Sequence, residues 1–571
     1  MTGARRRVGN LGRAMNTSRM IIVVAAVVAG LTAPAAAAPR PVEVQLLGLN
    51  DFHGHLESTT PGPIQVTTDP VSRTPAGGAE FLATHLRRLE AANRNTLIVS
   101  AGDLIGASPL ISALFHDEPT IEAMNRIGLD LNAVGNHEFD EGAAELRRMQ
   151  EGGCHADGCF GGDGFAGADF GFLAANVVDR VSREPLFAPY AIRKFNGIKV
   201  GFIGMTLEGT PDIVSQAGIR DLEFLDEAET ANRYARELRE RHGVRGIVVL
   251  LHEGGSQVAP FGVNSCNGIS GPIVDIVGRT TRAVDLFVTG HTHQPYNCVI
   301  DGRPVTSASS FGRLVTDIDL KLDRRSKDVV EVRANNRVIS QDVPRAADLT
   351  LLIGRYGALA APLADRLIGR ITTAITRVND DSGENAGGNL IADAQLAATR
   401  GAGAVAAFMN PGGVRADIAG DGAVTYGDAF SVQPFGNSLV TMTLTGAQLG
   451  EMLKQQWCDQ AFARILLPSQ VVTYTWDASV AAQVTGMACI GALTPVSDLR
   501  IGGQPVLAGQ AYRITVNSFL ADGGDRFFVL RSGGDRGGGA LDLDALEAYL
   551  APSLTGAAVA PPALDRLTRA P

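Results

Sequence analysis

The sequence predicts an α/β protein with two domains joined by a helix, and three observations support this. Between residues 42 and 325, short apolar runs alternate with amphipathic stretches, a pattern typical of strands separated by helices. After Pro344 a single long helical stretch follows, and from Ile368 to about Leu550 strand-like and helical segments appear again. A length of 571 residues allows up to about four domains, and two large ones fit equally well.

The first domain is expected at residues 42–340. Its expected strands are short, apolar and often β-branched, and they cover residues 42–49, 96–100, 131–134, 200–204, 247–251 and 286–289. Apolar residues recur at helical spacing over 78–91 and 228–241, so these stretches are expected to be helices. Strands separated by helices favour a largely buried sheet.

The second half begins with an expected linker helix at 345–367, after Pro344. A second α/β or α+β domain is expected at 368–551, with a helix near 388–399 and strands at 439–444 and 512–517. The remaining residues, 552–571, contain Pro561 and Pro562 and are expected to form a flexible tail.

The net charge is negative, because Asp and Glu number 60 against 50 Lys and Arg, which gives −10. This balance argues against a protein that coats duplex nucleic acid or an anionic membrane, since both need a basic surface. A small anionic substrate stays possible, because a metal or a local arginine cluster can reverse the field inside one cleft.

The first 38 residues have the pattern of a secretory signal peptide. A positive region precedes an uninterrupted apolar run at 20–31, and small residues at 33–38 offer a cleavage site; the arginines are Arg5, Arg6, Arg7, Arg13 and Arg19. The apolar run is short for a transmembrane helix, although an uncleaved anchor is the alternative. We expect an exported protein, secreted or held in the periplasm or cell envelope, with no membrane span in the mature chain.

The chain has six cysteines, which formally allow fifteen disulfide pairings. Their order along the chain suggests the pairs Cys154–Cys159, Cys266–Cys298 and Cys458–Cys489. A metal site is the alternative, but the cysteines are widely scattered. Disulfides are favoured in an exported protein.

Five apolar strands each end in Asp, Asn or His. The residues that follow the strands are Asp51 and His53, Asp103, Asn136, His252, and His291 with His293. In open α/β sheets ligands bind at the carboxyl ends of the strands. A single histidine at a strand end is usually an ordinary residue, but five such coincidences at one edge favour a metal site.

These seven donors are oxygens and imidazoles without a thiolate, and they exceed the needs of one tetrahedral ion. Two divalent cations that share a carboxylate are therefore expected, of the Zn, Mn, Co or Mg class, with Asp103 as the bridge. His137 is the expected proton donor, oriented by Asp140. Four other histidines are interpreted as ordinary residues, and His55 is ambiguous; the four are His85, His116, His155 and His242.

These blocks resemble the five motifs of the calcineurin-like metallophosphoesterase superfamily. They read Asp51-x-His53, Gly102-Asp103, Gly135-Asn136-His137-Glu138, His252 and Gly290-His291-x-His293. The second half is similar to the C-terminal domain of secreted 5'-nucleotidases, through Asn410-Pro411-Gly412-Gly413-Val414-Arg415, Gln433-Pro434-Phe435-Gly436-Asn437 and the segment Asn517 to Asp525. The resemblance implies a four-layer α/β/β/α metallophosphoesterase sandwich, a linker helix and a C-terminal α/β domain that binds substrate.

The resemblance also implies a role for each candidate residue. One metal would bind Asp51, His53, Asp103 and His293, and the other Asp103, Asn136, His252 and His291. His137 and Asp140 would form the catalytic dyad. In the C-terminal domain, Phe435 and Phe519 would stack on the base, Asp525 would contact the ribose, Arg415 the phosphate, and Asn410 the substrate.

The function implied is hydrolysis of nucleoside 5'-monophosphates to nucleosides and phosphate, with a metal-bound hydroxide attacking phosphorus and His137 assisting the leaving group. Two features differ from many nucleotidases: the 380–391 stretch is acidic, with Arg377 as its nearby arginine, and His293 stands where some have Gln. The alternatives are a 2',3'-cyclic phosphodiesterase/3'-nucleotidase, a nucleotide-sugar or dinucleotide pyrophosphatase, a sulfur-compound hydrolase on the same scaffold, and a secreted binding protein without turnover. The oligomeric state stays open.

Overall fold

The computed structural model describes residues 40–69, 71–160, 164–420 and 422–571. The expected signal peptide, residues 1–38, lies outside the described residues. The first sheet has the strand order β16-β15-β1-β4-β5-β6, in which the last four strands are parallel, β15 is antiparallel to β1, and β16 is antiparallel to β15. Its strands are β1 (Val42–Leu49), β4 (Thr96–Ser100), β5 (Leu131–Ala133), β6 (Gly171–Leu173), β15 (Leu314–Leu322) and β16 (Val329–Val338).

The second sheet has the order β13-β14-β12-β11-β9-β8, and its four central strands are parallel. Its strands are β8 (Tyr190–Phe195), β9 (Ile198–Thr206), β11 (Gly246–His252), β12 (Leu286–Thr289), β13 (Pro295–Ile300) and β14 (Arg303–Ala308). All the strands that the sequence predicts in this half are present, and β9 extends beyond the predicted 200–204 at both ends.

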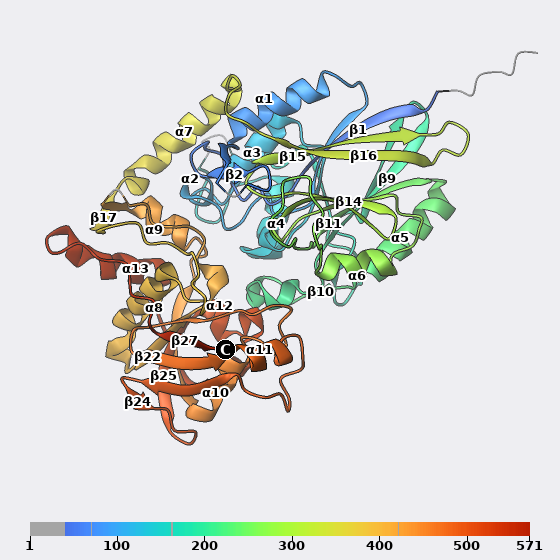
Figure 1. The fold of residues 1–571 in the computed structure, drawn as a ribbon. Coiled ribbons are helices and arrows are strands. Elements are labelled where there is room, and N and C mark those ends of the chain that lie inside the picture. The colour runs from blue at the N-terminus through green and yellow to red at the C-terminus, as the bar shows by residue number, and fades with distance from the viewer. Residues whose placement is uncertain (1–39, 70, 161–163, 421) are drawn as a thin grey trace, which may run out of the picture. The chain divides into compact units, whose positions relative to one another are not determined.

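The two sheets pack face to face because the strand residues alternate between two apolar environments. Val248 and Leu250 of β11 share one buried cluster with Leu46 of β1 between the sheets. Val249 and Leu251, which point the other way, pack in a cluster with the outer helices α5 (Glu227–His242) and α6 (Pro272–Arg279). On the first sheet, a cluster that includes residues of α1 (Ala79–Glu90) and α3 (Glu118–Ile127) covers the outer face. The predicted four-layer α/β/β/α sandwich is confirmed (Figure 1).

The linker helix α7 (Ala347–Ala364) lies against the first domain. Its buried residues Leu349, Leu352 and Tyr356 belong to the same apolar cluster as α1 and α3. Polar contacts at its edges are consistent with this packing: Asp348 pairs with Arg87 at 2.7 Å, and Tyr356 donates to Glu122 at 2.8 Å.

The C-terminal half contains a five-stranded and a four-stranded sheet with helices around them. The strands of the larger sheet are β21 (Leu467–Pro468), β18 (Ala406–Met409), β25 (Ala511–Asn517), β20 (Ser438–Thr445) and β26 (Gly534–Leu541), and the smaller sheet holds β24 (Gln504–Pro505), β23 (Val496–Ile501), β22 (Val472–Asp477) and β27 (Leu567–Ala570). Helices α8 (Ala386–Thr399) and α13 (Asp542–Leu550) share an apolar cluster beside the larger sheet. The predicted helix and both predicted strands are present.

The prediction of a flexible tail at 552–571 is wrong. Strand β27 pairs in parallel with β22, where Leu567 is buried. Just before it, the Arg566 guanidinium is buried against Asp393 at 2.7 Å and donates to the carbonyl of Pro468. The buried Glu384 carboxylate accepts the backbone N–H of Arg566 and Leu567. These partners lie far away in the sequence, so the local pattern does not reveal them.

Three disulfide bonds join Cys154 to Cys159, Cys266 to Cys298 and Cys458 to Cys489, as their order predicts. Such bonds persist in oxidising compartments, which is consistent with an exported protein. In the part of the chain that the structure describes, no helix combines the length and apolar character that crossing a bilayer requires.

Candidate metal centre

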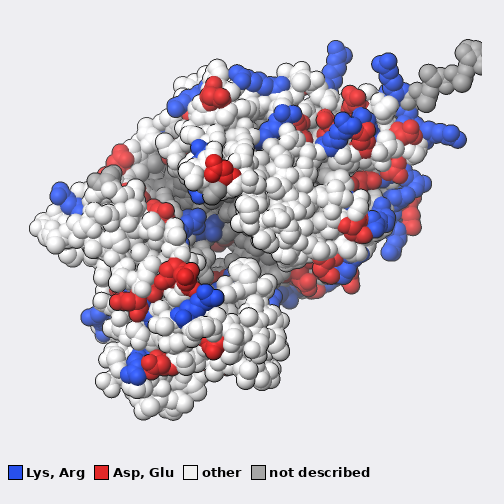
Figure 2. Space-filling view, viewed as in Figure 1, with Lys and Arg blue, Asp and Glu red and all other residues white. Residues whose placement is uncertain are grey.

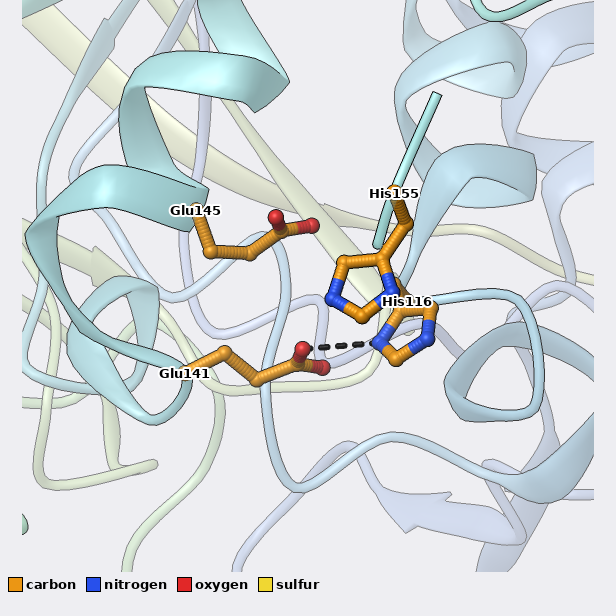
Figure 3. A group of neighbouring side chains, drawn as sticks. All are labelled: His116, Glu141, Glu145 and His155. Atoms are coloured by element: carbon orange, nitrogen blue, oxygen red, sulfur yellow. Dashed lines mark hydrogen bonds and ion pairs between the residues drawn. The ribbon is translucent and has the colours of Figure 1, made fainter. Parts of the chain in front are cut away.

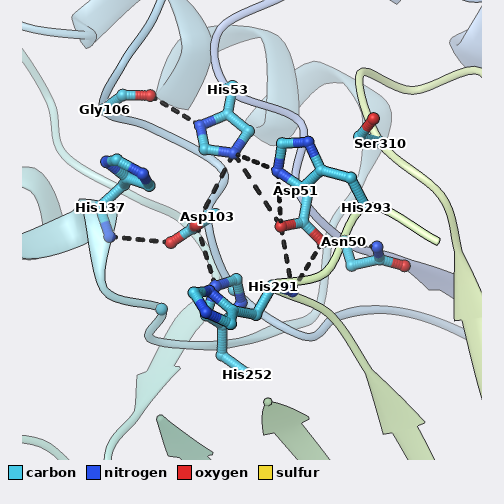
Figure 4. A network of polar contacts seen from close by, with 12 residues as sticks. Asn50, Asp51, His53, Asp103, Gly106, His137, His252, His291, His293 and Ser310 are labelled. Atoms are coloured by element: carbon cyan, nitrogen blue, oxygen red, sulfur yellow. Dashed lines mark hydrogen bonds and ion pairs between the residues drawn. The ribbon is translucent and has the colours of Figure 1, made fainter. Parts of the chain in front are cut away.

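The ends of five parallel strands from both sheets bring the predicted donors together (Figure 4). Three groups of ligand atoms each lie within 4.8 Å of one another: Asp51, His53 and His293; His53, Asp103 and His137; and Asp103, His252 and His291. The five residues Asp51, His53, Asp103, His291 and His293 all have positive φ angles, between 48° and 72°. Such strained backbone persists where function requires the side-chain positions.

Two glycines allow the candidate ligands to lie this close to the backbone. A Cβ atom on Gly135 would lie 2.1 Å from Oδ1 of Asp103, and one on Gly102 would lie 2.7 Å from Nδ1 of His252. A side chain at either position would displace a candidate ligand.

His53 presents an unprotonated nitrogen to the centre. Its Nδ1 donates to the carbonyl of Gly106 at 2.9 Å, and burial lowers the pKa of His53 well below its usual value, so Nε2 carries no hydrogen. That Nε2 lies 3.1 Å from Nε2 of His293 and 3.6 Å from Oδ2 of Asp103. Facing lone pairs repel each other unless a cation lies between them, so this arrangement fits a metal site.

In the second group, a backbone carbonyl likewise orients a histidine ring toward Asp103. His252 Nδ1 donates to the carbonyl of Ala101 at 2.7 Å, which leaves Nε2 facing Oδ2 of Asp103 at 2.9 Å. Burial lowers the pKa of His252, but the Asp103 carboxylate outweighs it and raises this pKa to about 10. The Asp103 carboxylate therefore favours a positive charge at the position of His252 Nε2. Asp103 lies between both groups of ligands, as a bridging carboxylate would.

Asn136 gives the clearest test of whether the residues fit a metal. Its Oδ1 atom is buried and has no hydrogen-bond partner among the described residues. An unpaired buried amide oxygen is costly, and coordination to a cation would satisfy it. The donor set of carboxylates, imidazoles and one amide oxygen therefore fits a pair of divalent cations.

Glu138 and Asn50 support the ligands and were not predicted. The Glu138 carboxylate accepts backbone N–H groups of Asp103 at 2.9 Å and Gly135 at 2.6 Å. Burial and the nearby Asp103 carboxylate raise the pKa of Glu138 to about 7. Asn50 donates to Oδ2 of Asp51 at 2.6 Å. The position of Glu138 beside Asn136 and His137 is the sequence signal that could have identified it.

The predicted dyad is in contact. His137 Nδ1 lies 2.8 Å from Oδ2 of Asp140, and the backbone N–H of His137 donates to Oδ1 of Asp103 at 2.9 Å. Burial lowers the pKa of His137, but Asp140 and Asp103 outweigh burial and raise it. The ring of His137 lies 5.0 Å from that of His53, edge to face. Asp140 and Asp103 thus favour the protonated form of this imidazole beside the metal ligands.

Two residues of the C-terminal half reach this centre. The ring of Phe435 stacks on that of His137 at 5.8 Å, and the Arg415 guanidinium lies 5.7 Å from the Phe435 ring centre. Burial lowers the pKa of Arg415, and Arg377 lowers it further, while Asp140 opposes both. Phe519 lines a small cavity with Pro211 and other residues.

Asn410 and Asp525 form a buried pair at 2.9 Å. Arg464, which the sequence analysis did not single out, forms an ion pair with the same Asp525 carboxylate. Asn517 donates to Oδ1 of Asn410 at 3.0 Å. These contacts fix the direction of the Asp525 carboxylate.

In the acidic 380–391 stretch, the exposed Asp380 and the buried Glu384 accept hydrogen bonds from the chain. Asp380 accepts from Ser382 and from the backbone of Glu384, and Glu384 faces Arg566. Nearby, burial lowers the pKa of Arg313 to about 10, with Arg377 as the next cause. Arg313, Arg377 and Arg415 are thus close enough to influence one another. Figure 2 shows Lys and Arg side chains inside a hollow on the face that it presents.

Comparison with known proteins agrees with this geometry. Residues 45–295 match the calcineurin-like phosphoesterase family, and residues 367–531 match the 5'-nucleotidase C-terminal domain. The chain is 32% identical to the cell wall protein Lmo0130 of Listeria monocytogenes, over 90% of this chain and 68% of that protein. The chain belongs to the 5'-nucleotidase family of calcineurin-like phosphoesterases.

Two further relatives of this family of phosphoester hydrolases are informative. The chain is 31% identical to the endonuclease YhcR of Bacillus subtilis over 84% of its length, but spans only 37% of that protein. The crystal structure of a 5'-nucleotidase precursor from Thermus thermophilus superposes with a TM-score of 0.75 at 27% identity, and covers 92% of this chain and 99% of that one.

Proposed function

We propose that this chain is an exported phosphohydrolase that depends on two divalent cations and converts nucleoside 5'-monophosphates to nucleosides and phosphate. The observation that carries the proposal is the convergence of six of the seven predicted donors beside the His137–Asp140 pair, with the buried Oδ1 of the seventh, Asn136, left without a hydrogen-bond partner among the described residues. The similarity to the Thermus 5'-nucleotidase precursor supports the substrate class.

Bound divalent cations would neutralise the phosphate and activate water in this site. Asp51, His53, Asp103 and His293 would hold one of them, and Asp103, Asn136, His252 and His291 the other. The chain's own residues supply the rest of the chemistry.

His137 would donate its proton to the departing 5'-oxygen. Asp140 accepts from Nδ1 of His137 and raises the pKa of its imidazole, which would favour a proton on Nε2 for the leaving group. Arg415 would pair with the phosphate oxygens, because its planar guanidinium matches them. Phe435 and Phe519 would stack on the base, and Asp525 and Asn410 would contact the ribose side of the substrate.

A second candidate function is the cleavage of substrates with a second phosphate or a phosphodiester. The positively charged side chains of Arg313 and Arg377 favour this second function, because they would bind another phosphate group. The substrates of this second function would be 2',3'-cyclic nucleotides and 3'-nucleotides, or nucleotide sugars and dinucleotides. A binding protein without turnover remains the alternative from another class, but it would not need the His137–Asp140 pair.

A substrate panel tests the proposal. Phosphate release is measured with AMP and 3'-AMP, and release of nucleotide or phosphate is measured with 2',3'-cyclic AMP, UDP-glucose and NAD, with the His137→Ala variant as a matched control. We expect AMP to be the fastest substrate. If AMP is not hydrolysed and a diester or a pyrophosphate is hydrolysed rapidly, the result would support the second candidate function instead.

The organisation of the chain forms part of the proposal. We propose a signal peptide at 1–38, a catalytic domain at 42–340, the linker helix at 345–367 and a nucleotide-binding domain at 368–551. Three disulfides support export. N-terminal sequencing of the exported protein is expected to begin near residue 39, and a chain that retains residue 1 would contradict cleavage.

A further inference from the structure

A second cluster of potential ligands lies apart from the donors of the metal centre. It consists of His116, Glu141, Glu145 and His155, and one ligand atom of each lies within 4.8 Å of the others. In the sequence both histidines stand in helical or loop contexts and are expected to be ordinary residues. The structure brings them together (Figure 3).

Three separate segments supply the cluster. His116 lies in the turn between α2 (Leu110–Ala113) and α3, and Glu141 and Glu145 lie at the start of α4 (Gly142–Glu151). His155 belongs to the short loop closed by the Cys154–Cys159 disulfide. Since these cysteines are bonded to each other, the available donors are imidazoles and carboxylates.

The two imidazoles are stacked, with ring centres 3.6 Å apart and an angle of 25° between the planes. His116 Nδ1 lies 2.7 Å from Oε2 of Glu141. Oδ2 of Asp157 lies 3.5 Å from Nε2 of His116 and also 3.5 Å from Nδ1 of His155. His155 Nδ1 also accepts the backbone N–H of Asp157 at 3.1 Å. In Figure 3 the two rings lie beside the carboxylates of Glu141 and Glu145.

The position of His116 between the Asp157 and Glu141 carboxylates resembles that of many metal-binding histidines. A ligating imidazole commonly directs its other nitrogen to a carboxylate, which fixes the ring and strengthens its donor nitrogen. Two protonated imidazoles in face-to-face contact would repel each other, whereas one cation shared between neutral rings would not. The surrounding carboxylates of Glu141, Glu145 and Asp157 supply the negative charge that such a cation needs.

Arg148 orients the Glu145 carboxylate without occupying all of the lone pairs on its oxygens. Its Nε and Nη2 atoms donate to the Glu145 carboxylate at 2.9 and 2.7 Å, and its Nη1 donates to Glu118 at 2.6 Å. A carboxylate can accept about four hydrogen bonds, so the Glu145 oxygens keep lone pairs for a metal. The arginine thus orients this carboxylate toward the histidines.

We propose that His116, Glu141, Glu145 and His155 bind a third divalent cation, of the zinc class. Two imidazoles and two carboxylates form a four-coordinate donor set that suits Zn²⁺, which accepts nitrogen and oxygen ligands in tetrahedral geometry. This inference does not depend on the substrate or on the reaction proposed above.

The ion would fasten the disulfide-closed loop to the start of α4 and to the turn before α3. Glu141 directly follows Asp140, whose carboxylate contacts His137. The site would therefore also stabilise the turn that carries Asp140. Among the described residues, its four ligands form a group that shares no member with the groups of the metal centre, so the proposed role of the site is structural.

Zinc stoichiometry of the full chain tests the proposal. The protein is saturated with Zn²⁺, freed of excess by gel filtration and analysed for metal by mass spectrometry. His155→Ala and Glu145→Gln are compared with the wild type and with His242→Ala, which removes a histidine that contacts Tyr190 elsewhere. Melting curves confirm that each variant is folded, and His155→Gln replaces His155→Ala if that variant is not.

We expect the wild type and His242→Ala to bind one more zinc ion per chain than either cluster variant. This difference does not depend on how many ions the metal centre holds. Equal zinc content in all four proteins would overturn the proposal. Zinc-edge anomalous diffraction from crystals of the wild type is expected to show a peak between His116 and His155, and its absence at full zinc occupancy of the metal centre would also overturn it.

Discussion

The ring of Phe435 lies nearly parallel to the imidazole of His137, with 18° between their planes and 5.8 Å between their centres. These residues are almost 300 positions apart in the sequence, one in each half of the chain. An aromatic surface suited to a nucleobase and a proton donor suited to its leaving group thus lie in direct contact. One predicted substrate residue, Phe435, therefore lies beside the predicted proton donor, His137.

Replacement of His137 by alanine removes the proposed proton donor and none of the proposed metal ligands. We expect kcat for AMP to fall by about 10² to 10⁴, the usual contribution of acid–base catalysis. Metal analysis of the same preparation is expected to give the wild-type content. Undiminished turnover in this variant would rule out the assigned role.

Replacement of Phe435 by alanine removes one stacking partner of the base. Base stacking contributes about 1–3 kcal/mol, so we expect KM for AMP to rise by about tenfold. Hydrolysis of p-nitrophenyl phosphate, which has no nucleobase, serves as the control and is expected to change little. An equal loss on both substrates would show that Phe435 acts through His137 and not through the base.

Arg415 is expected to act on the phosphate, which both substrates share. Arg415→Ala should lower kcat/KM for AMP and for p-nitrophenyl phosphate alike, by about 10², the effect of removing one charge-stabilising donor. Arg400→Ala, which changes an exposed arginine of the same domain, is the control. A loss confined to AMP would contradict a phosphate contact.

Arg566 tests the corrected C-terminal segment. Arg566→Ala leaves Asp393 buried and unpaired, so we expect the free energy of unfolding to fall by about 3–5 kcal/mol. Arg569→Ala, which changes an exposed residue of the same strand β27, is expected to have a much smaller effect. Equal denaturation midpoints for the two variants would show that the buried pair is unimportant.

Much of the first domain and of the metal centre is predictable because its signals are local. An apolar β-branched run identifies β1 or β11, and the polar residue directly after it, Asp51 or His252, lies at the strand end that parallel sheets use for ligands. The cysteine pairs that the order along the chain suggests are also present, although the sequence alone does not choose among the fifteen pairings.

The features that escape prediction depend on distant partners. Arg566 finds Asp393 at a separation of 173 residues, so the proline-containing segment before β27 looks flexible in the sequence. Arg464 meets Asp525 across 61 residues, and no local pattern marks either contact. His116 and His155 lie in a turn and a loop without periodicity, so their proximity is visible only in the folded chain.

Phosphate release from AMP by the metal-depleted protein, before and after addition of Mn²⁺ or Zn²⁺, tests the central claim most directly. The donors around Asp103 predict no release after chelation, recovery of activity when the cation is added, and no recovery in an Asp103→Asn variant. Release that is insensitive to chelation, or a wild-type protein that stays inert on AMP with every divalent cation supplied, would contradict the account.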